Sequence, residues 1–153
     1  MLRTFIGALV GFIALSMFSR GAATLISALF GCQFAYKEVG SFELTQTWAV
    51  LALTLGFVGC FLGGKITYRI GGWKACKVLA LVIILIGMFF VASENKRDQG
   101  QLALEREGQN PCDLSLSDAS RLSVVPAWYN ILTPLVGAAA VWIAGGGVRR
   151  KKA

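Results

Sequence analysis

Four long runs of apolar residues, separated by polar segments, dominate the pattern along the chain. They cover residues 4–19, 46–64, 75–93 and 127–147, and each approaches the roughly 20 residues that a helix needs to cross about 30 Å of hydrocarbon. An N–H or C=O group left unpaired in lipid costs several kcal/mol, whereas a helix pairs these groups within one segment. The pattern therefore predicts an all-α integral membrane protein, with a four-helix transmembrane bundle as the single domain of residues 1–153.

The segment 21–36 is apolar but short, and it follows Arg20 directly. A helix here would gather Leu25 and Leu29 on one face and place Thr24 opposite, which predicts a short interfacial helix on the outer surface. A fifth span, which would move the N-terminus outside, is the alternative. One continuous helix through Arg20 is disfavoured, because an arginine at mid-membrane costs roughly 2.5–3.5 kcal/mol.

The connection 94–126 differs in composition from the rest of the chain, because it is polar and contains Gly and Pro. It includes two helix-compatible stretches, 99–107 and 115–122, and Asp113 or Ser115 is suited to cap the second. A segment of this length is too short for an independent domain. We expect it to form a polar outer cap over the bundle.

Basic residues gather in two clusters that contain no acid. These topology-setting residues are Lys65, Arg69, Lys74 and Lys77, in and beside the predicted inner loop 65–74, and Arg149, Arg150, Lys151 and Lys152 in the tail 148–153. The outer loop 20–45 has no net charge, and the loop 94–126 has four basic against six acidic residues. Because basic flanks stay on the cytoplasmic side, both termini are predicted to be cytoplasmic. The expected location is a bacterial inner (plasma) membrane.

Composition agrees with a membrane protein and narrows its chemistry. The 153 residues are 56% hydrophobic and 15% charged, and the mean hydropathy is +0.64, which is too apolar for a small soluble domain. The net charge of +7 is explained by the two basic clusters, so we expect no nucleic-acid partner. Histidine is absent, which removes the commonest metal and haem ligand. We predict no metal site and no cofactor.

Small residues at helical spacing indicate where helices pack. They allow two backbones to approach closely in lipid, where hydrophobic attraction between helices is lacking. The predicted helix-packing residues are Gly7, Gly11, Gly59, Gly63, Gly137, Ala140 and Ala144. The sequence leaves open whether these contacts lie within one chain or between copies.

Two of the four cysteines, Cys32 and Cys112, fall in the predicted outer segments. In an oxidising compartment they are candidates for a disulfide that ties the first outer loop to the cap. A second interpretation rests on residues 29–32, Leu-Phe-Gly-Cys, which resemble a bacterial lipoprotein cleavage box. Phe30 is bulkier than that family pattern favours, and Arg20 interrupts the preceding apolar run. The resemblance implies a lipidated Cys32.

Function is predicted mainly by class. No charged residue lies deep within the four predicted spans, which argues against proton-coupled transport, and no catalytic group stands out, so an enzyme is not predicted. We expect an accessory, assembly or scaffold component that acts through helix packing and its outer loop. Its expected partners are the lipid bilayer and another membrane protein or a second copy of itself. The alternative is an oligomeric channel or transporter for a small solute. A membrane thiol-redox enzyme is less well supported, because paired cysteines are missing.

Overall fold

The computed structural model describes residues 1–38, 40–94 and 99–146. Within these ranges the chain is all-helical and has three helices long and apolar enough to cross a membrane. These helices are α1 (Leu2–Phe30), α2 (Gln46–Glu94) and α5 (Ala127–Ala144). The shorter elements are η1 (Cys32–Phe34), α3 (Gln99–Arg106), η2 (Pro111–Asp113) and α4 (Leu116–Leu122).

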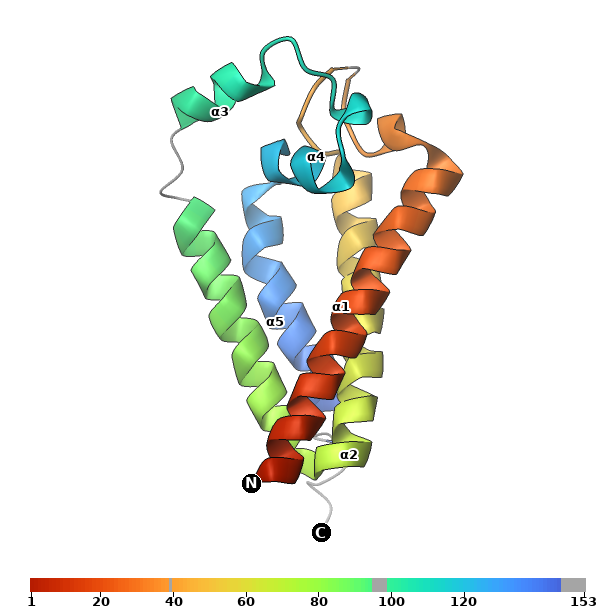
Figure 1. Cartoon of the computed structure of the whole chain (residues 1–153), viewed down its shortest axis with the longest axis vertical. Helices are drawn as coiled ribbons and strands as arrows, with labels where there is room; N and C mark the ends of the chain where they lie inside the picture. The colour runs from red at the N-terminus through yellow and green to blue at the C-terminus, as the bar shows by residue number, and fades with distance from the viewer. Residues whose placement is uncertain (39, 95–98, 147–153) are drawn as a thin grey trace.

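The longest helix, α2, is folded back on itself at Gly72. This residue has φ 70° and ψ −167°, a backbone conformation that is essentially restricted to glycine. Residues 46–71 run toward one end of the molecule and residues 73–94 return from it (Figure 1). The predicted inner loop 65–74 is therefore helical apart from this one residue, because a single glycine reverses the chain.

Helix α1 also differs from the prediction. It continues without interruption through Arg20 to Phe30, so the predicted short interfacial helix over 21–36 is not a separate element. Its 29 residues make it about 44 Å long. Figure 1 shows α1 inclined across the first half of α2. Arg20 thus becomes part of an apolar helix.

The remaining helices pack on α2 from separate sides. Helix α1 lies against residues 46–71, whereas α5 contacts both halves of α2 (Figure 1). The main apolar core lies where α5 meets α2, and it includes Leu79 at 1% exposed and Val141 at 0% exposed. Most other large apolar side chains of the helices are exposed.

A small cap covers one end of the helices, and we use "cap" for residues 32–45 and 99–126. Both predicted helical stretches of the outer segment are present, as α3 and α4. Ser115 caps α4, because its Oγ accepts a hydrogen bond from the Asp118 backbone N–H at 3.2 Å. We call the opposite end of the molecule, where the N-terminus lies and the two halves of α2 meet, the base (Figure 1). The predicted tail 148–153, with its four basic residues, lies outside the described residues.

Candidate functional site

The predicted packing glycines of α1 meet α2 closely. A Cβ built at Gly7 would lie 2.8 Å from the Gly71 backbone nitrogen. A Cβ at Gly11 would fall on the Thr67 hydroxyl and 2.8 Å from the Gly63 carbonyl oxygen. Backbone atoms cannot move aside as a flexible side chain can, so only glycine fits here. Thr67 is fully buried, and its hydroxyl has no hydrogen-bond partner among the described residues.

The other predicted packing residues also have contacts within the chain. A Cβ at Gly59 would lie 2.9 Å from the Phe18 ring of α1, and one at Gly137 would lie 3.2 Å from Cys60 Sγ. Ala140 is completely buried, and the Ala144 methyl group faces Gly64. All seven predicted small residues therefore serve the chain's own helix packing.

Four further glycines take part in close packing without having been singled out. Gly64 lies against Val141, Gly71 against α1, Gly87 against Pro134, and Gly145 against the Trp73 ring. Gly71 follows Gly63 by eight residues, so extending the small-residue spacing into the predicted loop would have identified it. No spacing pattern identifies Gly87 as a packing residue. It packs against Pro134 of α5, and this contact between distant parts of the chain cannot be inferred from the spacing of residues in the sequence.

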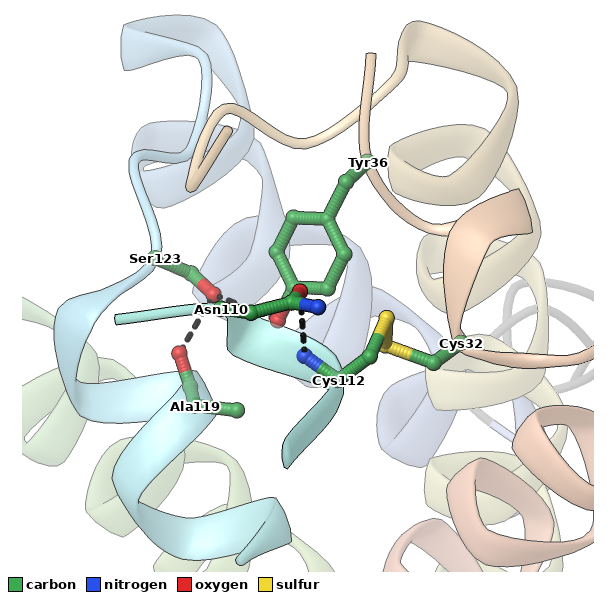
Figure 2. The surroundings of a disulfide bond; sticks show 6 residues. All are labelled: Cys32, Tyr36, Asn110, Cys112, Ala119 and Ser123. Carbon is green, nitrogen blue, oxygen red and sulfur yellow. Dashed lines mark hydrogen bonds between the residues drawn. A yellow bond between two sulfur atoms is a disulfide. The ribbon is translucent and has the colours of Figure 1, made fainter. Parts of the chain in front are cut away.

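The two segments of the cap are joined by a disulfide between Cys32, two residues after the end of α1, and Cys112 (Figure 2). Their Cα atoms are 5.5 Å apart, although 80 positions separate them in the sequence; this spacing is typical of disulfides. A bonded Cys32 sulfur is not available for lipidation. Cys60 and Cys76 are buried free thiols.

Hydrogen bonds brace the cap around this disulfide. The Tyr36 and Ser123 hydroxyls lie 3.2 Å apart, and Ser123 Oγ donates to the Ala119 carbonyl at 2.6 Å. Next to the disulfide, the Asn110 side-chain oxygen accepts from the Cys112 backbone N–H at 3.2 Å (Figure 2). Residues from both sides of the disulfide thus share one hydrogen-bonded layer.

Backbone pairing joins the same two segments a second time. The Leu44 N–H donates to the Val124 carbonyl at 3.1 Å, and the Val124 N–H donates to the Phe42 carbonyl at 2.8 Å. Arg106 crosses the cap from α3, donating from Nε to the Leu122 carbonyl at 2.8 Å while its guanidinium lies 5.9 Å from the centre of the Phe42 ring. The cap is therefore held by covalent, backbone and side-chain links together.

The surface of the cap is charged. Lys37 Nζ lies 2.7 Å from a Glu43 carboxylate oxygen, and Arg121 pairs with Glu105 at 3.0 Å. The hydrogen bond from Lys37, and then its positive charge, lower the pKa of Glu43 below its ordinary value. All eight acidic residues of the chain fall within residues 38–43 and 94–118. Exposed ion pairs contribute little to stability, so these charges mainly define the surface.

The base carries the opposite charge. Arg3, Lys65, Arg69, Lys74 and Lys77 gather there around Gly72 without an acid among them. Arg3 Nε donates to the Ile70 carbonyl at 2.6 Å, next to the reversal of α2. Two lysines lie over rings of their own helix, Lys65 at 5.1 Å from the Phe61 centre and Lys77 at 5.9 Å from the Trp73 centre. The four predicted topology-setting residues of the described region are thus all at one end, while Arg149–Lys152 lie outside it.

The described part of the chain was compared with the side-chain groupings that hold metal ions. It contains no group of three or more His, Cys, Asp or Glu residues placed to hold a metal ion. Protein-family models, curated proteins and solved structures show no match to this chain. Its candidate functional surfaces are therefore the braced cap, the cationic base and the exposed faces of the long helices.

Proposed function

We propose that the chain crosses a membrane four times, with the two halves of α2 supplying two of the crossings. Residues 46–71 and 73–94 form helices of about 39 and 33 Å, and α5 is about 27 Å long. Each length suits a hydrocarbon layer of about 30 Å with modest tilt or adjustment of the bilayer. Gly72 then lies at one membrane surface and the cap at the other.

Two independent features support placing the base in the cytoplasm and the cap outside. Five described cations lie at the base and no acid accompanies them, which is the charge distribution of a cytoplasmic face. The Cys32–Cys112 disulfide lies at the opposite end, and disulfides persist in oxidising compartments such as the bacterial periplasm. Both termini are then cytoplasmic, in the inner (plasma) membrane of a bacterium.

We infer that the protein is an accessory, assembly or scaffold component, and the braced cap is the observation that carries this proposal. A charged layer with a disulfide and paired backbone segments presents a fixed surface outside the membrane, and a preformed surface binds a partner at a smaller entropic cost. The centre of the helices is filled by side chains such as Leu79, Ala140 and Val141, each 1% exposed or less. A solute path, as in the alternative channel function, would have to run between copies of the chain.

The proposal is tested by combining topology mapping with site-specific crosslinking in intact cells. Reporter fusions after Ala153 should be cytoplasmic, and the protein should resist alkaline carbonate extraction. A photo-crosslinking amino acid at exposed Leu104 of the cap should capture a membrane protein, and Cys112→Ser should weaken that crosslink. The matched control is the same probe at Leu81, in the second half of α2. The proposal would be contradicted if the C-terminal reporter were exported or if alkaline carbonate released the protein. It would also be contradicted if Cys112→Ser left the crosslinks from Leu104 unchanged.

A further inference from the structure

Arg20 lies close to the middle of the proposed membrane layer, because the packing contacts fix the register between α1 and α2. The two helices are antiparallel, with Gly7 against Gly71 and Phe18 against Gly59. Arg20, two residues beyond Phe18, is therefore level with residues 57–58. That level is about 17 Å from Gln46 at the cap end of α2 and about 20 Å from Gly71 at the base.

Interfacial residues place the midplane at the same level. Trp48 and Lys65 are residue types that mark membrane surfaces, and the 17 positions between them correspond to about 26 Å of helix. Their midpoint falls at residues 56–57, within one helical turn of the Arg20 level. Because α1 does not break at Arg20, this placement puts a charged residue deep in a span, which differs from the sequence-based expectation.

The Arg20 side chain also points away from the rest of the chain. Successive helical residues are rotated by about 100°, which places Arg20 roughly opposite Gly7 and Gly11, the residues of α1 that contact α2. The Arg20 residue is exposed, and no described residue forms an ion pair with it. The neighbouring Thr24 hydroxyl is satisfied within the helix, because it donates to the Arg20 carbonyl at 3.0 Å. The Arg20 guanidinium thus lies on the outward face of α1 without an ion-pair partner among the described residues.

No second copy of this chain can supply that partner at the same depth. Every acidic residue falls within residues 38–43 or 94–118, and the acidic residues that the structure describes lie at the cap end. Charged side chains at mid-membrane pair with one another or line a polar interior, because isolation in hydrocarbon is costly. We propose that the outward face of α1 binds a transmembrane helix of a different protein, and that an Asp or Glu of that helix pairs with Arg20.

This inference rests on the proposed function, and its test uses the same cells. A photo-crosslinking amino acid at Met17, which is 71% exposed on α1, should capture a protein with an acidic residue inside a transmembrane helix. Arg20→Leu should lower that crosslink at least about tenfold, since removing one member of a buried charge pair leaves the other unpaired. Arg20→Lys should retain a substantial part of it. Arg20→Glu should abolish the crosslink. In that Arg20→Glu background, replacing the partner's acidic residue by a basic one should restore it.

The control probe is placed at Leu85, which is 57% exposed on the second half of α2; its crosslinks should not change with Arg20→Leu. Formation of the Cys32–Cys112 disulfide in every variant, read on non-reducing gels, shows that the chain has folded. Crosslinks at Met17 only to lipid, only to a second copy, or unchanged in Arg20→Leu would overturn the inference. The proposed function survives those results if carbonate resistance and the cap crosslinks persist, so the two failures are distinguishable.

Discussion

Replacing Gly11 by alanine tests the close approach of α1 and α2 directly. The new Cβ would coincide with the Thr67 hydroxyl and lie 2.8 Å from the Gly63 carbonyl oxygen. Inserting a methyl group into a tightly packed contact costs about 1–3 kcal/mol. Alanine also gains about 0.5–1 kcal/mol over glycine within a helix. The expected net result is a loss of up to about 2.5 kcal/mol in the free energy of unfolding.

The same helix provides a matched control at Gly21, where a built Cβ meets nothing within 4 Å. Gly21→Ala should therefore be neutral or stabilising by up to about 1 kcal/mol. Both variants are compared with the wild type by tryptophan fluorescence during thermal unfolding in mild detergent. Equal stability of the Gly11→Ala and Gly21→Ala proteins would refute the proposed packing of α1 on α2.

A double-mutant cycle locates the clash. Thr67→Ala removes the hydroxyl that stands where the Gly11 Cβ would be, so Gly11→Ala should cost less in that background. Part of the penalty should remain, because the Gly63 carbonyl oxygen belongs to the backbone. Strict additivity of the two substitutions would show that these positions do not touch.

Three further predictions concern the two ends of the molecule. Cys112→Ser removes the disulfide, whose sequence separation is 80, and should lower the free energy of unfolding by about 2–4 kcal/mol. Thermal unfolding of the wild type and the variant, with and without reductant, measures this. A wild-type melting temperature that does not change with reductant would contradict the prediction. The pKa of Glu43 is lowered by Lys37, so the stabilisation from this ion pair is fully present above pH 4.5 and is lost as the pH falls through the lower pKa of the folded state. Lys37→Gln should raise the pKa of Glu43, which an NMR titration measures. An unchanged pKa in this variant would count against the ion pair. Arg3→Ala removes a hydrogen bond of 2.6 Å to the end of the first half of α2 and should cost about 0.5–1.5 kcal/mol in thermal unfolding; an unchanged melting temperature would show that the bond contributes nothing.

The long helices could largely be predicted because apolar runs of span length have few alternatives in lipid. Residues 46–64 and 75–93 fall entirely within the two halves of α2, and α5 begins at the predicted residue, Ala127. The cap helices were predictable for a different reason, since Ser115 and Asp118 carry a local capping signal. In both cases the determining information lies within a few neighbouring residues.

Two features escaped prediction because they depend on residues far apart. From the sequence alone, the cost of burying an arginine in lipid predicts that a helix ends near Arg20. In the structure α1 instead continues through Arg20, packs along α2, and leads into Cys32 of the cap. The basic residues on either side of Gly72 predict a loop over residues 65–74, whereas the structure reverses the chain at Gly72 alone. Nothing local distinguishes a glycine that turns a chain from Gly71, its neighbour, which packs against α1.

If the chain crosses the membrane as proposed, the one-residue reversal at Gly72 determines how its two central helices would enter. With no intervening linker, neither half of α2 can be threaded far without drawing in the other, so the two halves are delivered together as a helical hairpin. Lys65, Arg69, Lys74 and Lys77 surround its tip, and these charges oppose translocation of the tip.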